Sequence, residues 1–177
     1  MIIANQLEKT NIAEYILYMF QVEDLIRAND LNMLKLKQNI ISKFKQPKNI
    51  IEKIEHWYEG LIDLMKIEKI EKRGHLNFVK LKLTDLNTIH LLIIKENKDT
   101  QYLQTYNIAL GNIELFKHKT GKENLNNIEI CFNALYGFLL LKLKNKSVSK
   151  LTEESMKSFS NLLNQLAQKY HKNKIRK

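Results

Sequence analysis

The chain has 177 residues and a mass of 21.0 kDa, which suits one hydrophobic core and is short for two domains. Apolar residues make up 44% and charged residues 27%, with five glycines and one proline, so disordered, collagen-like and many-turned all-β chains are excluded. The single cysteine excludes an internal disulfide and a cysteine-based zinc cluster.

The spacing of apolar residues predicts about seven helices joined by short turns. In chain order they cover about 11–29, 31–44, 47–65, 76–95, 102–121, 127–144 and 152–170. Asn11 is expected to cap the first helix, with Glu14 as its capping-box partner. Segment 78–83 also alternates like a strand, but a lone strand would have no partner, so it is assigned to a helix.

Two of these helices, 11–29 and 127–144, are apolar on nearly every side. A helix without a wide polar face is buried by its neighbours. The sequence therefore predicts an all-α fold in which residues 1–177 form a single compact domain, with two central helices wrapped by five amphipathic ones. The basic segment 171–177 is expected to be a flexible, solvated tail.

Charged residues within the first helix are the strongest candidates for a site. Glu23 and Asp24 lie four and three positions before Arg27, so both carboxylates are expected to reach the guanidinium. All three fall among apolar residues, where charges are either paired or line a cavity. A structural ion pair and a ligand-binding pocket both remain open. Gln21 and Glu14 share a narrow arc on the opposite side, where they are candidate contacts to a neighbouring helix or a second subunit and candidate ligand-binding residues.

Catalytic and metal motifs are missing from the sequence. Glu52 and His56, like Glu114 and His118, are four residues apart, whereas di-iron bundles use a three-residue offset. Cys131 lies in the most apolar helix, where a thiol is inert. There is no glycine-rich phosphate loop. We therefore expect no catalytic residue, no metal and no cofactor.

Several phrases resemble one uncharacterised bacterial family. They are 11–19 (NIAEYILYM), 21–28 (QVEDLIRA), 57–59 (WYE), 74–76 (GHL) and 131–139 (CFNALYGFL). Together they resemble the domain-of-unknown-function family 4924, all-helical proteins of the Bacteroidota. The resemblance spans nearly the whole chain. It implies an all-helical, cytoplasmic protein and supplies no activity, cofactor or catalytic residue.

The net charge of +10 rests on lysine, since only Arg27, Arg73 and Arg176 are arginines. Abundant lysine, asparagine and isoleucine together indicate an AT-rich coding sequence, and specific nucleic-acid readout favours arginine. No secretory signal or membrane-length apolar run is present, so we expect a cytoplasmic protein. The sequence favours a non-enzymatic protein that associates with a partner or with itself. The alternatives are a small-molecule or metal site around Glu23, Asp24 and Arg27, and weak, non-specific nucleic-acid binding.

Overall fold

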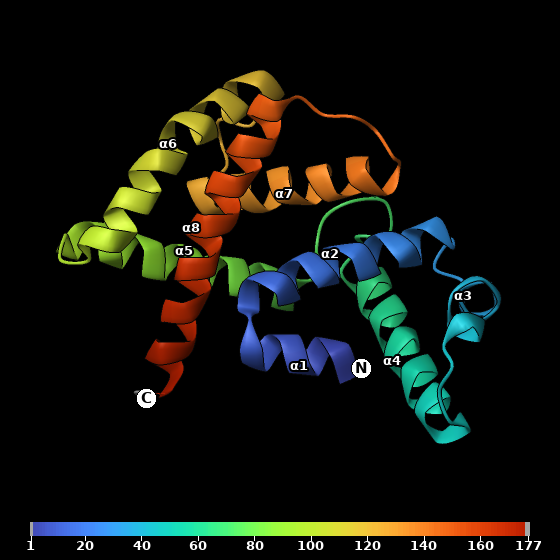
Figure 1. The fold of residues 1–177 in the computed structure, drawn as a ribbon. Helices are drawn as coiled ribbons and strands as arrows, with labels where there is room; N and C mark the ends of the chain where they lie inside the picture. The colour runs from blue at the N-terminus through green and yellow to red at the C-terminus, as the bar shows by residue number, and fades with distance from the viewer. Residues whose placement is uncertain (1, 176–177) are drawn as a thin grey trace.

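The computed structural model describes residues 2–175, and the side chains of residues 2–172. Within that range the chain forms eight α helices and one 3-10 turn, with no strand (Figure 1). The helices are α1 (Ile2–Thr10), α2 (Ile12–Ala28), α3 (Met33–Asn39), α4 (Lys48–Ile67), α5 (Asn77–Glu96), α6 (Thr100–Thr120), α7 (Asn127–Leu143) and α8 (Lys150–Ile175), and the 3-10 turn is η1 (Ile41–Lys43). The all-α, single-domain prediction is confirmed, and α2 to α8 correspond to the seven expected helices.

Helix α2 lies at the centre of the molecule and contacts α1, α5, α7 and α8 (Figure 1). Nine of its side chains are buried, around most of its circumference, which confirms its predicted central position. Asn11 caps it, because the side-chain oxygen accepts from the backbone N–H groups of Ala13 and Glu14. The second bond of the predicted capping box, from the Asn11 N–H to the Glu14 side chain, is replaced. The Asn11 N–H donates instead to the carbonyl of Leu7, in the preceding helix α1.

Two local features differ from the sequence prediction. Helix α1 was not expected; Ala4 is its only buried residue, so its apolar stripe is thin, and it is held by folding back against α2 (Figure 1). The expected helix 31–44 is broken at Ile40, where φ is −122°. Leu36 and Ile41 are both buried, and in a continuous helix their side chains would point about 140° apart. The break turns Ile41 inward.

The second predicted central helix, α7, is central only in its first half. Ile128, Ile130, Cys131, Phe132 and Ala134 are buried, whereas the side chains from 135 to 140 are half-buried and those from 141 to 143 are exposed. Helices α5, α6 and α8 pack against α7, but they leave its C-terminal end uncovered on one side. Even so, none of the helices in residues 2–175 is long and apolar enough to span a membrane.

Helix α8 crosses in front of α5 and α7 and closes the bundle (Figure 1). Tyr170 is buried, Lys169 pairs with Asp99 at the start of α6, and the His171 Nε2 accepts from the Ile12 N–H at 3.2 Å. The helix continues to Ile175, so the first five residues of the segment 171–177 are helical. Residues 176 and 177 lie outside the described part, and the flexibility of this segment stays a prediction.

Candidate functional site

The predicted charged residues of α2 lie where three parts of the chain meet: the last two turns of α2, the α4–α5 connection and the middle of α7. The connection contributes His75, and α7 contributes Tyr136. We call the five side chains the charged clamp: Glu23, Asp24, Arg27, His75 and Tyr136.

Glu23 is completely buried and binds the start of α5. Its Oε1 accepts from the Leu76 backbone N–H at 2.9 Å, and its Oε2 lies 2.6 Å from the His75 Nδ1. Leu76 is the N-cap residue of α5, so the carboxylate also lies at the positive end of the helix dipole. The His75 ring stacks on Phe20 with 3.7 Å between ring centroids and 16° between planes. These contacts satisfy a buried carboxylate with groups of the chain itself.

Arg27 binds the α4–α5 connection from the opposite side. Its Nη1 donates to the Asp24 Oδ1 at 2.9 Å, and its Nη2 donates to the carbonyls of Ile70, at 3.2 Å, and Gly74. Gly74 has φ of +96°, a conformation that a side chain would strain. Of the two carboxylates expected to reach the guanidinium, only Asp24 does so among the described residues. Neighbouring helix positions project about 100° apart, and Glu23 therefore points to His75 instead.

Tyr136 completes the clamp by joining α7 to α2. Its hydroxyl donates to the Asp24 Oδ2 at 2.6 Å and lies 3.3 Å from the Phe20 carbonyl. Burial raises the pKa of Tyr136, and the hydrogen bond to Asp24 raises it further, so the proton stays on the phenol. Asp24 is the open edge of the clamp, because 46% of its side-chain surface is exposed.

The other two candidate residues lie apart from these contacts. The Gln21 side chain donates to the Leu17 carbonyl one turn back, at 3.4 Å, and Glu14 is exposed in the first turn of α2. Sequence reasoning missed His75 and Tyr136 as members of the site. His75 follows a turn glycine and resembles a loop residue, and Tyr136 lies in an apolar stripe and resembles core. Only the packing of distant segments brings them to α2.

A second polar cluster lies between α5, α6 and α7, and we call it the neutral cluster: His90, Tyr102, Tyr106 and Asn127. The His90 Nδ1 lies 2.7 Å from the Tyr102 hydroxyl, and the Asn127 amide donates to the Tyr106 hydroxyl at 2.8 Å. Burial lowers the pKa of His90 to about 4, so the ring is neutral at pH 7. A lone histidine on the apolar stripe of a helix is expected to be a core residue with one bonded ring nitrogen. His90 is such a residue.

The described residues contain no group of three or more His, Cys, Asp or Glu placed to hold a metal ion. His56 is exposed, with its Nδ1 3.8 Å from Glu59, and Glu114 pairs with Lys117. Cys131 is buried, and burial raises the pKa of its thiol, which favours the unreactive form.

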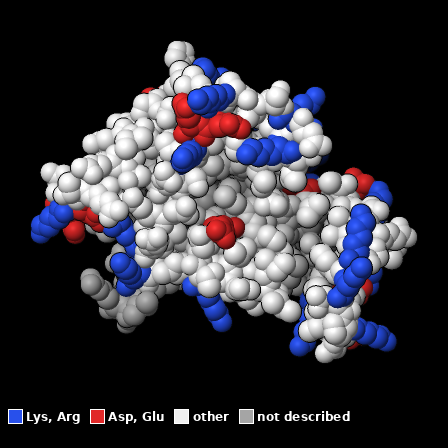
Figure 2. Space-filling view, in the orientation of Figure 1, with Lys and Arg blue, Asp and Glu red and all other residues white. Residues whose placement is uncertain are grey.

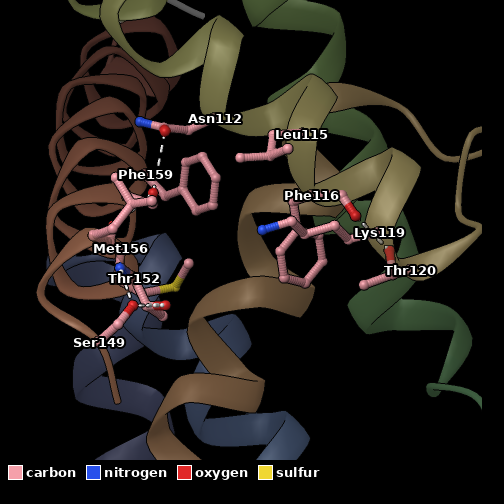
Figure 3. A pocket seen from close by; sticks show the side chains of 11 residues that line it. Asn112, Leu115, Phe116, Lys119, Thr120, Ser149, Thr152, Met156 and Phe159 are labelled. Atoms are coloured by element: carbon pink, nitrogen blue, oxygen red, sulfur yellow. Dashed lines mark hydrogen bonds between the residues drawn. The ribbon is translucent and has the colours of Figure 1, made fainter.

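The feature that sequence reasoning did not find is an apolar groove between the C-terminal half of α6 and the N-terminal half of α8. It has a volume of about 310 Å³. In Figure 3 the rings of Phe116 and Phe159 lie on opposite sides of the groove, with Met156 beside Phe159. We call it the α6–α8 groove, and its lining residues are Asn112, Leu115, Phe116, Lys119, Thr120, Ser149, Leu151, Thr152, Ser155, Met156 and Phe159.

The uncharged polar side chains of the groove are already bonded within the protein. The Asn112 Oδ1 accepts from Ser155 at 3.1 Å, and this bond is drawn in Figure 3. The Thr120 hydroxyl donates to the Phe116 carbonyl at 2.8 Å, and the Ser149 hydroxyl accepts from the Thr152 N–H at 3.2 Å. Two leucines at the rim are exposed, Leu115 by 44% and Leu151 by 61%. The groove therefore offers apolar surface more than free donors and acceptors.

The clamp and the groove differ in the chemical groups that they leave free to contact a binding partner. The charges of the clamp bind the chain's own backbone and side chains, whereas the groove exposes apolar surface that no described residue covers. Comparisons with curated proteins and with solved structures give no match. A comparison with protein families gives a match over residues 1–177, to the family described as Domain of unknown function (DUF4924). The chain belongs to this family, which confirms the resemblance seen in the sequence, and the family has no established function.

Proposed function

We propose that this is a non-enzymatic, cytoplasmic helical protein that acts by protein–protein association. The observation that carries the proposal is the α6–α8 groove, an open apolar surface rimmed by the exposed Leu115 and Leu151. Apolar surface of this kind, gathered in one place, is typical of interaction sites. The occupant is a partner protein or a second copy of the chain.

The alternative, a small-molecule or metal site at Glu23, Asp24 and Arg27, has less support. A ligand there would have to displace the contacts of Glu23 with Leu76 and His75, or those of Arg27 with Ile70 and Gly74. Each of these is a bond to a buried or half-buried charge, which is costly to leave without a partner. The most accessible side chains of the clamp are Asp24, 46% exposed, and His75, 30% exposed, and both are already bonded within the clamp.

Nucleic-acid binding through the lysines has less support still. Bidentate readout of bases requires arginine, and Arg73 is the exposed arginine of the described residues, while Arg27 is occupied in the clamp. Any binding to DNA or RNA is expected to be weak, non-specific and lost as the salt concentration rises.

The experiment that tests association places a photo-crosslinking amino acid at Leu151, at the groove, and at Leu91, an equally exposed leucine of α5, in cells that normally make the protein. We expect one discrete protein adduct from position 151 and none from position 91. Sedimentation of the purified chain over a range of concentrations then identifies a second copy, if the adduct is a dimer. The absence of an adduct specific to position 151, together with a monomer at all concentrations, would contradict the proposal.

A further inference from the structure

Helix α1 is held to the rest of the protein by few contacts. Six of its nine residues are exposed, and Ala4 is its one buried side chain. The two isoleucines at its start face solvent, Ile2 by 61% and Ile3 by 47%. A hollow of about 150 Å³ remains between Ile2 and two residues of α4, Ile50 and Ile54. Helix α1 can therefore leave its place at a small cost in buried apolar surface.

The surface on which α1 lies is formed by α2 and by Lys82 of α5, and we call it the α1-binding surface. Helix α1 runs back along α2 after a sharp reversal of the chain, and α2 is the helix that it chiefly contacts (Figure 1). Near the end of α1 the Glu8 Oε1 pairs with the Lys82 Nζ at 2.9 Å. The surface therefore binds a short amphipathic helix that carries a carboxylate opposite Lys82.

A single residue, Asn11, separates α1 from α2, and its backbone is extended, with φ of −152° and ψ of 96°. The N–H groups of Asn11 and Tyr15 already bond to carbonyls four residues earlier, as they would in an unbroken helix. The N–H groups of residues 12–14 bond instead to the His171 ring and to the Asn11 side chain. In a straight helix these three groups would bond to the last three carbonyls of α1. Straightening therefore replaces three hydrogen bonds with three others.

A straight α1–α2 helix removes α1 from its own chain and can place it on a second copy. In the hairpin, α1 lies antiparallel to the first half of α2, with the reversal at Asn11 (Figure 1). Two straight helices that lie antiparallel, with a two-fold axis at Asn11, put each α1 beside the same residues of the other copy's α2. Each chain then regains the contacts that it loses, and the pair of Glu8 with Lys82 is among them.

We infer that the α1-binding surface binds α1 of a second copy, so that two chains exchange these helices and form a dimer. This surface shares no residue with the α6–α8 groove, so the inference goes beyond the proposed function. Because the contacts of α1 are the same in monomer and dimer, the equilibrium depends on the Asn11 hinge and on repulsion between the chains.

The repulsion follows from the net charge of +10 on each chain. Figure 2 shows basic side chains at several places around the edge of one face of the molecule. Added salt screens such repulsion. The share of dimer should therefore rise with salt as well as with protein concentration.

The first test reverses the charges of the ion pair. Glu8→Lys places two lysines together on the α1-binding surface, and Lys82→Glu places two carboxylates there, so neither variant alone forms the pair. When the two variants are unfolded in urea and refolded together, the mixed dimer brings opposite charges together on both surfaces. Native mass spectrometry, with a mass tag on one variant, measures the mixed dimer. The matched control is the pair of Lys37 with Glu55, 2.9 Å apart, reversed as Lys37→Glu and Glu55→Lys.

We expect the mixture of Glu8→Lys and Lys82→Glu to contain about tenfold more dimer than either variant alone. The control mixture should contain no more dimer than its separate variants. The double variant Glu8→Lys/Lys82→Glu restores the pair within each chain and should associate like the unchanged protein. Folded variants that give no mixed dimer would overturn the inference, and so would an equal gain in the control mixture.

The second test acts on the hinge. Asn11→Ala removes the cap that holds the break, so the dissociation constant of the dimer should fall about tenfold. Asn32 caps α3 in the same way, by accepting from Leu34 and Lys35, and Asn32→Ala is the matched control. Sedimentation over a range of concentrations gives both constants. A constant that Asn11→Ala leaves unchanged would overturn the exchange. A dimer that Leu151→Gln abolishes and Asn11→Ala does not affect would overturn it too, and would support association at the groove.

Discussion

The charged clamp and the neutral cluster are two ways of burying polar side chains in one helical domain. The clamp holds ionised groups and uses them to fix backbone, since Glu23 and Arg27 bind the connection between α4 and α5. In the neutral cluster the bonds between its own members join uncharged groups, such as the His90 ring and the Tyr102 hydroxyl, while Lys117 donates to the Asn127 side chain from outside the cluster. An irregular segment has unpaired carbonyl and N–H groups that charged side chains can bind, whereas a helix has none in its middle.

Removing the cation from the clamp is expected to have the largest effect. Arg27→Ala removes the donor of the Ile70 and Gly74 carbonyls and the cation beside the Asp24 carboxylate, which keeps its bond from the Tyr136 hydroxyl. We expect the free energy of unfolding to fall by an amount near the lower end of about 3–5 kcal/mol, because Asp24 is partly hydrated. Urea unfolding measures it, with Arg73→Ala, an exposed arginine of the same connection, as the control. Equal stability of both variants would show that the guanidinium contributes nothing to the fold.

Acid should act on the neutral cluster. The pKa of His90 is lowered to about 4 in the fold and is about 6.5 in the unfolded chain, so the unfolded chain binds the proton first as pH falls. The stability from neutral His90 is thus complete above about pH 6.5 and is lost toward pH 4, by up to about 3 kcal/mol. In His90→Asn, whose amide can keep the bond to Tyr102, this part of the pH dependence should vanish. If the stability of His90→Asn depended on pH as that of the unchanged protein does, His90 would not be the group responsible.

A matched pair of tyrosines compares the two clusters directly. Tyr136→Phe removes a hydroxyl bonded to the Asp24 carboxylate, and Tyr106→Phe removes one bonded to the Asn127 amide. Bonds to charged groups contribute about 1.5–3 kcal/mol and neutral ones about 0.5–1.5. We expect Tyr136→Phe to cost more by about 1 kcal/mol in the free energy of unfolding. A larger loss of stability in Tyr106→Phe than in Tyr136→Phe would show that burial, more than charge, determines how much these two hydroxyls stabilise the fold.

The smallest effect is expected at Glu14, which the sequence grouped with the site. It is exposed in the first turn of α2, where its charge interacts with the helix dipole alone. Glu14→Gln should therefore lower stability by no more than about 0.5 kcal/mol. Glu23→Gln, at the buried position nine residues later, should lower the melting temperature several times more. A large loss of stability in Glu14→Gln would show that Glu14 makes contacts like those of the candidate site residues.

Sequence reasoning succeeded where the signal is local. Asn11 caps α2 because its side chain reaches N–H groups two and three residues away, and the charges of Glu23, Asp24 and Arg27 were identified because they share an apolar arc of one helix. The partners that complete the clamp lie far along the chain: His75 is 52 residues from Glu23, and Tyr136 is 112 residues from Asp24. No periodicity within one helix encodes such pairs.

The groove was missed for a different reason. Phe116 and Phe159 belong to regular apolar stripes, and a stripe predicts that one face of a helix is buried without saying what covers it. Helices α6, α7 and α8 pack against one another, but at this end Leu115 and Leu151 stay at the surface. Coverage depends on the crossing angles of three helices, which the sequence of any one of them does not contain.

The bond from the Ile12 N–H to the His171 ring has a consequence for how the chain is made. The two residues are 159 positions apart. During synthesis on the ribosome, this hydrogen bond of the first turn of α2 cannot form until α8 has emerged. Contacts across such long sequence separations form late, because the intervening chain must first be brought together. The helix at the geometric centre of this protein is therefore expected to consolidate among the last during synthesis, after the α5–α8 bundle has formed around the place it will occupy.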